Sequence, residues 1–288
     1  MVDQATRLRK LVKAKEIKGS ETRVIAIASG KGGVGKTNVA VNLGLALQKK
    51  GKRVLLLDAD LGMANVDILL GLTPKYNLNH VLKGKCDFYE ALLEGPEGLH
   101  VLPGTSGVED LINISSREVN RLIETFNQME ENYDIILIDV GAGIHYSVIN
   151  FIMGCDEVVV VLTPEPTAVM DAYSLIKIMA NHGYNRDISL LINQVSNQQE
   201  GDKVTGRMTK VIEEYLGLDV RVMGYIPFDE HIRQAVKAQQ AVVHLYPGSK
   251  AGKAFSGIAE RVLNQTRTKK PKGMKGFVSK IIGIIGRN

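Results

Sequence analysis

A glycine-rich loop at residues 29–37 constrains the fold of this chain more than any other stretch. Its sequence, SGKGGVGKT, contains the pattern G-x-x-x-x-G-K-[ST] from Gly30 to Thr37. A β-branched run, RVIAIAS, precedes the loop, and a helical pattern, TNVAVNLGLALQKKG, overlaps its end. Glycines let the backbone curl so that successive N–H groups face one anion, and the following helix adds the positive end of its dipole. The sequence therefore predicts a phosphate-binding loop between a strand and a helix.

Two side chains of this loop have distinct expected roles in a nucleotide site. Lys36 is expected to reach the β- and γ-phosphate oxygens, and the Thr37 hydroxyl is expected to ligate Mg²⁺. The alternative, a glycine-rich turn without a ligand, is disfavoured by the strand and helix on either side. The loop residues predicted to contact the nucleotide are Gly30, Lys31, Gly32, Gly33, Val34, Gly35, Lys36, Thr37 and Asn38.

Short β-branched runs recur along the chain and predict a parallel sheet. They are RVIAIASG, RVLLLDAD, YDIILIDVGAG, DEVVVVLTPEP, ISLLINQV and VRVMGYIPFD, and helical patterns separate them. This alternation favours an α/β fold with a mostly parallel central sheet and helices on both faces. At 288 residues and 44% hydrophobic content the chain can bury one large domain. We expect that domain at residues 21–265, between an N-terminal segment, 1–20, and a C-terminal segment, 266–288.

Three aspartates are predicted at the carboxyl ends of strands, where ligands of such sheets bind. Asp58 and Asp60 end the run RVLLLDAD and share one face, because alternate residues of a strand point the same way. Asp139 ends the apolar run IILID, which fits an acid that holds the hydration shell of Mg²⁺. The alternative for Asp139 is a helix-capping role. Thr37 and Asp139 are thus predicted metal residues, and two carboxylates at the end of one buried strand, Asp58 and Asp60, are costly without a cation.

Charge, cysteine content and hydropathy disfavour a nucleic-acid-binding protein, a disulfide-rich protein and a membrane-spanning protein. The net charge of +5 is weak evidence for an anionic partner unless it is clustered, and we do not expect nucleic acid to bind. Cys86 and Cys155 lack the CxxC spacing of a disulfide framework or thiolate metal site. No stretch approaches the roughly 18 apolar residues of a membrane span. A cytoplasmic location is expected.

The second lysine of the loop, Lys31, is badly placed for phosphates held by its own loop. With it, GKGGVGKT resembles the deviant Walker A motif of the MinD/ParA family of P-loop NTPases. The resemblance implies an ATPase that uses ATP/ADP and Mg²⁺ and forms an ATP-dependent homodimer, in which Lys31 crosses to the partner's nucleotide. A cation supplied in trans stabilises the charge that develops during phosphoryl transfer, as an arginine finger does. A solvent-exposed lysine without such a role is the alternative.

The same resemblance implies roles for further residues. Asp58 matches the residue that assists at the magnesium shell, which adds it to Thr37 and Asp139 as a predicted metal residue. Asp60 matches the residue that positions the attacking water, which makes Lys31, Lys36 and Asp60 the expected catalytic residues. Gly141 and Gly143, in the stretch GAG, look like switch II, a loop that moves with the γ-phosphate. Relatives usually carry Ser or Thr where this chain has Val140, so hydrolysis is expected to be slow and to depend on a partner or lipid.

Two further stretches look like the base-binding elements of the family. Asn193 and Gln194, in LLINQV, are expected at the adenine edge, where an amide offers both a donor and an acceptor. Pro227 and Asp229, in YIPFD, match the base-binding loop. A plain turn is the alternative for YIPFD, since Pro and Asp favour turns.

The C-terminal stretch MKGFVSKIIGIIGR predicts a short cationic amphipathic helix. Lys and Arg are its only charged residues, and its apolar side chains gather on one side of a helical wheel. Such a helix suits an anionic membrane surface, and members of the MinD branch carry a membrane-targeting helix at this end. The alternative is a helix docked on the protein's own core. The predicted membrane residues are Phe277, Lys280, Ile281, Ile284 and Ile285.

The N-terminal stretch DQATRLR resembles the DQAxxLR activator motif of the FlhG family of flagellar-number regulators, also called FleN or YlxH. The resemblance implies stimulation of an FlhF-type GTPase and contacts with flagellar basal-body or C-ring proteins. An ordinary basic helical tail is the alternative. The matching residues are Asp3, Gln4, Ala5, Leu8 and Arg9.

Four functions remain open on the sequence. The preferred one is an ATP-dependent dimerising switch, peripheral at the cytoplasmic face of the membrane, that regulates flagellar number and assembly. The others are a DNA-partitioning ATPase of the ParA kind, an electron-transfer ATPase that shares an iron–sulfur cluster between subunits, and a scaffold that binds nucleotide without hydrolysing it.

Overall fold

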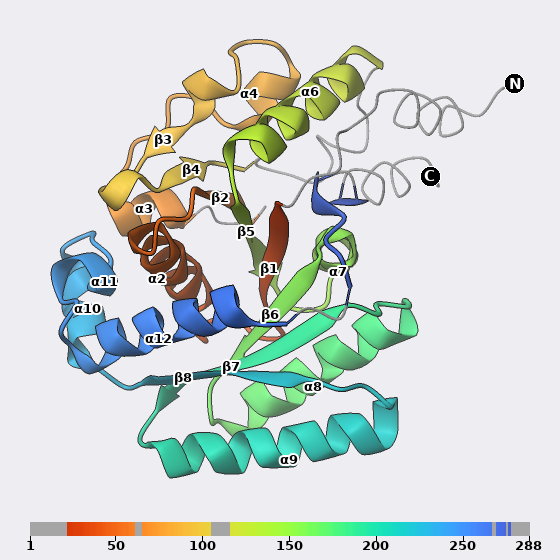
Figure 1. Cartoon of the computed structure of the whole chain (residues 1–288), viewed down its shortest axis with the longest axis vertical. Helices are drawn as coiled ribbons and strands as arrows, with labels where there is room; N and C mark the ends of the chain where they lie inside the picture. The colour runs from red at the N-terminus through yellow and green to blue at the C-terminus, as the bar shows by residue number, and fades with distance from the viewer. Residues whose placement is uncertain (1–21, 61–64, 105–115, 267–268, 275, 278–288) are drawn as a thin grey trace, which may run out of the picture.

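A single eight-stranded sheet forms the centre of the molecule (Figure 1). The structure is a computed structural model that describes residues 22–60, 65–104, 116–266, 269–274 and 276–277. The strands are β1 (Arg23–Ser29), β2 (Val54–Ala59), β3 (Leu93–Glu94), β4 (His100–Leu102), β5 (Ile135–Ala142), β6 (Glu157–Leu162), β7 (Asp187–Val195) and β8 (Arg221–Pro227). Their spatial order is β3-β4-β2-β5-β1-β6-β7-β8. All pairings are parallel except that of β3 with β4.

The helices connect these strands and lie on both faces of the sheet. The α-helices are α2 (Lys36–Lys49), α3 (Val66–Leu70), α4 (Leu78–Leu82), α6 (Ser116–Asn132), α7 (Tyr146–Gly154), α8 (Pro166–Asn181), α9 (Gln198–Leu216), α10 (Glu230–Lys237), α11 (Val242–Leu245) and α12 (Lys250–Asn264). Two 3₁₀ turns, η1 (Tyr89–Ala91) and η2 (Pro96–Gly98), flank β3. The α/β fold predicted from the sequence is therefore confirmed.

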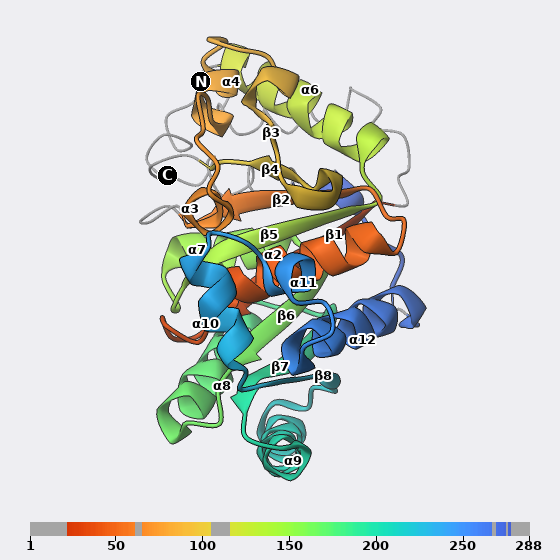
Figure 2. The same cartoon turned by 90° about the vertical axis from the view of Figure 1, so that its left-hand side faces the viewer.

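Each face of the sheet has its own apolar core. One core joins the sheet to α2, α3, α10, α11 and α12, and Figure 2 shows most of these helices in front of the sheet. The other core joins it to α4, α6, α7, α8 and α9. Central strands are buried on both faces, so they read as continuous apolar runs. This explains why the six long strands were predictable, whereas β3 and β4 are too short to carry a pattern.

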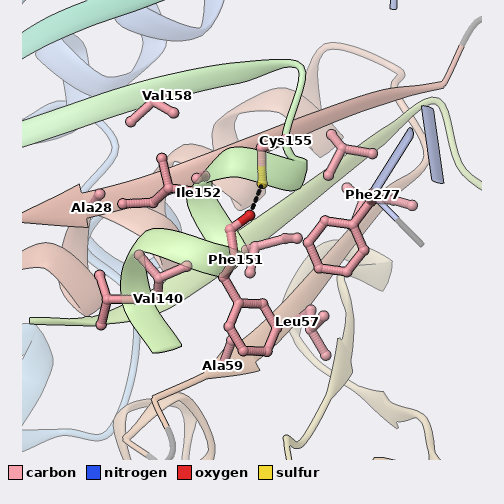
Figure 3. Packing of buried hydrophobic residues seen from close by; sticks show 14 of the residues in the cluster. Ala28, Leu57, Ala59, Val140, Phe151, Ile152, Cys155, Val158 and Phe277 are labelled. Carbon is pink, nitrogen blue, oxygen red and sulfur yellow. Dashed lines mark hydrogen bonds between the residues drawn. The ribbon is translucent and has the colours of Figure 1, made fainter. Parts of the chain in front are cut away.

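Register and side-chain alternation place the polar residues of the strand ends. Asp58 of β2 pairs with Asp139 of β5, so these two carboxylates lie side by side on neighbouring strands. Val140 follows Asp139 and points to the opposite face, where its side chain is fully buried in the α7 and α8 core (Figure 3). Position 140 therefore has a packing role, and its side chain faces away from Asp139. A hydroxyl at this position would not reach the site, so its absence gives no geometric reason for slow hydrolysis.

Phe277, which the sequence predicts at a membrane surface, is buried against the chain's own core in this structure. Its ring is 1% exposed and lies 5.9 Å from the rings of both Phe126 and Phe151, centroid to centroid (Figure 3). Met274 is also fully buried. The start of the tail thus adopts the alternative conformation, docked on the chain's own core, because its apolar residues fill a site on α6 and α7.

Other terminal predictions cannot be compared with the structure. The N-terminal motif residues and Lys280, Ile281, Ile284 and Ile285 lie outside the described residues. Within the described ranges, no helix has both the length and the apolar character needed to span a bilayer.

Candidate nucleotide site

The phosphate-binding loop is held against α8 and β7 by close contacts that only glycine permits. A Cβ on Gly30 would overlap the backbone carbonyl of Asp171 in α8. Gly35, which begins α2 as its N-cap, has φ 86°, and a Cβ there would lie 2.5 Å from Nδ2 of Asn193. Ser29 adds a hydrogen bond from its hydroxyl to the carbonyl of Lys31 at 3.0 Å. These contacts fix the two ends of the loop and leave Gly32 and Gly33 exposed at its tip.

Lys36 lies beneath the loop in a buried ion pair with Asp139. The Lys36 ammonium donates to Oδ1 of Asp139 at 2.6 Å, and the two side chains are 6% and 1% exposed. Burial raises the pKa of Asp139, and the Lys36 charge opposes that effect. Oδ2 of Asp139 is also buried and has no hydrogen-bond partner among the described residues. A buried anionic oxygen without a partner is an expected feature of a position that receives a hydrated cation.

Asp58 completes a pair of acids at this edge. Burial, and then the neighbouring charge of Asp139, raise the pKa of Asp58 to about 6. Backbone N–H groups of Asp60, Asn65 and Val66 donate to its two oxygens at 3.1 to 3.3 Å. Two adjacent buried carboxylates repel each other, and a divalent cation relieves that repulsion.

Asp58 and Asp139 fit a Mg²⁺ ion that is held jointly by the protein and a nucleotide. No described group of three or more His, Cys, Asp and Glu side chains could bind a metal by protein ligands alone. Mg²⁺ in such sites keeps waters and phosphate oxygens and takes few protein ligands. The Thr37 hydroxyl, Asp58 and Asp139 would hold it here. Bound Mg²⁺ would neutralise phosphate charge during transfer.

Asp60 lies next to the loop predicted to be switch II. It is half-buried just beyond the end of β2, and a Cβ built on Gly141 would be 3.7 Å from its Oδ1. Gly143 donates its backbone N–H to the carbonyl of Ser29 at 2.9 Å and has φ 97°. The structure therefore brings Asp60 and switch II together beside the start of the phosphate-binding loop.

Lys31 is directed to α8 and away from the buried pair. Its ammonium donates to the hydroxyl of Thr167 at 3.1 Å and lies 3.5 Å from the carboxylate of Glu165. The Lys31 side chain is 40% exposed. The two lysines of the loop thus point to different places, Lys36 to the buried Asp139 and Lys31 to the protein surface. The contacts with Glu165 and Thr167 had no sequence signal, because more than 130 positions separate the partners.

Asn193 has a second role that the sequence did not indicate. Its Nδ2 donates to the carbonyl of Val34 at 2.8 Å, and its Oδ1 accepts the N–H of Gln194 at 3.0 Å. One amide hydrogen and one lone pair remain for a base edge. Asn193 therefore braces the phosphate-binding loop, and its contact with adenine stays a prediction, as does that of Gln194.

Asp229 is engaged within its own turn. It caps the N-terminus of α10 by accepting the N–H of His231 at 3.0 Å, and it accepts the N–H of Ala251 in α12 at 2.9 Å. Burial works against ionisation, but these donors outweigh it and lower the pKa of Asp229 to about 2. The turn alternative accounts for this residue, and the base-binding role of Pro227 and Asp229 stays untested.

Comparison with known proteins identifies the family of the chain. Residues 22–190 match the AAA domain family. The chain is 43% identical over 262 residues to the antiactivator FleN of Pseudomonas aeruginosa, covering 90% of this chain and 93% of that protein. It is 33% identical to the flagellum site-determining protein YlxH of Helicobacter pylori, covering 99% of this chain and 100% of that protein. The septum site-determining protein MinD of Pyrococcus horikoshii, solved with Mg-ADP, superposes with a TM-score of 0.66 at 29% identity, covering 84% and 96% of the two chains.

Proposed function

The chain belongs to the FlhG (FleN, YlxH) group of the MinD/ParA family of P-loop ATPases, and we propose that it is a dimerising switch that regulates flagellar number or placement. It is an ATPase of that family. ATP binding brings two subunits together, and hydrolysis separates them. One observation carries this proposal: Lys31 lies at the surface against α8, while Lys36 is buried in an ion pair with Asp139.

The surroundings of Lys31 favour a second copy of the chain as its partner. Exposed apolar side chains are found on the segments that follow β5 and β6, on either side of the β1 end that carries Lys31. Apolar side chains of this size left in water favour contact with another protein surface. They are Ile144 at 48%, Tyr146 at 60% and Met170 at 61% exposed. In the dimer Lys31 leaves Glu165 and Thr167 and stabilises the γ-phosphate of the facing subunit.

Light scattering after size exclusion tests the dimer. Asp60→Ala should bind ATP without hydrolysing it and elute as a dimer with ATP and as a monomer with ADP. Adding Lys31→Ala should return the ATP-loaded protein to a monomer that still binds ATP, because Lys36 is intact. Lys177→Ala, which removes an exposed lysine on α8, the helix that Lys31 contacts, is the matched control and should leave the dimer unchanged. A dimer that survives Lys31→Ala would refute the role in trans.

Membrane association is the second part of the proposal. Because the start of the tail is docked on the core, a truncation that tests it must begin after Phe277. The apolar side chains of residues 278–285 are proposed to enter an anionic bilayer after Phe277 leaves its site on the core. Deleting residues 278–288 should abolish binding to anionic vesicles and keep ATP binding, and it spares the buried Met274 and Phe277. Vesicle binding that persists in this truncation would refute the assignment. Binding of random duplex DNA at about 150 mM salt instead would favour a partitioning function.

The N-terminal segment is proposed to act on a partner GTPase of the FlhF type, and the whole protein on flagellar basal-body or C-ring components. The match of residues 3–9 to the activator motif supports the first, and the similarity to FleN and YlxH supports the second. Gln4→Ala should abolish stimulation of the GTPase without changing ATP hydrolysis by this chain. Stimulation that is unaffected would contradict the assignment.

A further inference from the structure

Thr163 carries a buried hydroxyl at the nucleotide edge of the sheet that the site described above does not use. The residue is 6% exposed and follows directly after β6. Its Oγ1 is one of four buried side-chain atoms in the described chain that have no hydrogen-bond partner; another is Oδ2 of Asp139. A buried hydroxyl without a partner destabilises a fold, so an unpaired one at a binding edge calls for a reason.

Register and alternation place Thr163 on the face that carries the phosphate-binding loop. Val159 and Val161 belong to the core on the α2 side, and the alternation of the strand continues to Thr163. Leu162 pairs with Ile192 across β6 and β7, so Thr163 is the neighbour of Asn193. On the other side β6 pairs with β1, from which the loop begins. Thr163 therefore lies between the two strands that hold this loop.

The strands on either side of β6, β1 and β7, each hold a carbonyl of the loop. Ser29, at the end of β1, donates to the carbonyl of Lys31, and Asn193, on β7, donates to the carbonyl of Val34. The carbonyl of Gly35 accepts from Val39 within α2. Because the N–H groups of such a loop face the phosphates, its carbonyl groups point toward the sheet. There they need hydrogen-bond donors. Ser29 and Asn193 supply two such donors, and Thr163 is a third that is not yet engaged.

We propose that Thr163 is a positioning residue for ATP binding, whose hydroxyl donates to a carbonyl of the phosphate-binding loop when the loop closes on the nucleotide. Nucleotide binding then gains a hydrogen bond that the free protein lacks. A hydrogen bond that forms only in the nucleotide-bound state lowers the Kd for the nucleotide. The hydroxyl therefore contributes to nucleotide binding and not to the stability of the free chain. The proposal rests on nucleotide binding alone and is independent of dimerisation.

Thr163→Val separates the two contributions, since it keeps the side-chain shape and removes the hydroxyl. Without nucleotide, its thermal unfolding midpoint should equal or exceed that of the wild type, because an unpaired buried hydroxyl is gone. The Kd for Mg-ADP, and the Kd for Mg-ATP in the Asp60→Ala background, should both rise about 3- to 10-fold, which is the contribution of one hydrogen bond. Thr163→Ser should restore both Kd values. Measuring ADP keeps the outcome separate from any failure of the dimer proposal.

Tyr184→Phe is the matched control, because it removes another buried hydroxyl that has no partner in the described chain, between α8 and the amino end of β7. It should leave both Kd values unchanged. Wild-type affinity in Thr163→Val would overturn the proposal. A lowered midpoint without nucleotide, restored by Thr163→Ser while the Kd values stay constant, would also overturn it by showing a purely structural hydroxyl. If Thr163→Val does not fold, Thr163→Ala compared with Thr163→Ser gives the same two readings.

Discussion

Gly154→Ala is expected to release the tail from the core and to increase membrane binding of the nucleotide-free protein. Gly154 ends α7 directly beneath Phe277. A Cβ at this position would lie 2.8 Å from Cδ2 of Phe277, 3.2 Å from its Cα and 3.3 Å from its carbonyl oxygen. Rotation of the ring relieves only the first of these contacts, because the other two involve backbone. The docked tail must therefore shift or leave.

The size of the effect follows from the cost of overpacking a core. An extra methyl group forced into a packed site costs about 1–3 kcal/mol, which lowers the equilibrium for tail docking about 5- to 140-fold. Ala also favours the helical conformation of α7, by about 0.5–1 kcal/mol. That gain is present with the tail docked or released, so it does not enter the docking equilibrium. The tail sequence itself is unchanged, so its affinity for lipid is the same once it is free.

Two assays on the nucleotide-free protein measure this prediction. Trypsin should cleave after Lys269 and Lys272 faster in Gly154→Ala, in proportion to the undocked population. Sedimentation with anionic vesicles should show stronger binding by a similar factor. Gly206→Ala on α9 is the control, because a Cβ there meets nothing within 4 Å. Faster cleavage without stronger vesicle binding would refute the idea that docking limits membrane access, and no change in either assay would refute the contact with Phe277 as the restraint.

Three further predictions concern the site and its surroundings. Lys36→Met should abolish the stabilisation by Mg-ATP and should lower the free energy of unfolding at pH 7 by about 3 kcal/mol, because Asp139 is left buried without a cation. In urea unfolding this loss should shrink as the pH is lowered, since burial raises the pKa of Asp139 and protonation removes its charge. Asp229→Ala should cost about 2 kcal/mol at pH 7, which corresponds to the lowering of its pKa from 3.8 to about 2. That contribution is complete above pH 4 and disappears as the pH falls through 2, so the wild type and the variant should converge in unfolding experiments toward pH 2. Val140→Thr should lower stability by about 1–2 kcal/mol because it buries a hydroxyl in an apolar core, and phosphate release should keep its rate, since position 140 faces away from Lys36.

Local sequence patterns were enough to predict the fold and the placement of Asp58 and Asp139 at the ends of their strands. Each central strand is a buried apolar run, so its position follows from the residues themselves. Asp58 and Asp139 end two such runs, and the parallel sheet places them side by side. The loop pattern likewise identified Lys36, whose role depends on residues adjacent in the chain. Where the relevant neighbours are close in sequence or repeat with the strand period, the sequence is sufficient.

Contacts between distant segments escaped prediction. Asn193 and Val34 are 159 positions apart, and Lys31 and Thr167 are 136 apart. Neither pair has a spacing that recurs in sequence, and both depend on where β7 and α8 lie after folding. The unpaired hydroxyl of Thr163 belongs to the same class, because its burial and the absence of a partner within the described chain emerge only once β1, β6 and β7 are neighbours.

The C-terminal tail shows what an amphipathic pattern cannot predict. The pattern identifies the apolar side of the helix but not the surface that covers it. Backbone N–H groups of Lys272 and Gly273 donate to Asp156 at 2.6 and 3.1 Å, so the segment before Phe277 is anchored at the amino end of β6. Phe277 contacts α7, the helix that begins just after switch II. An apolar side chain cannot be covered by the core and by lipid at once, so the two surfaces compete for it. If residues 141–143 act as switch II, as the sequence predicts, a movement of this loop that displaces α7 would change the balance of that competition and would link the nucleotide state to the tail.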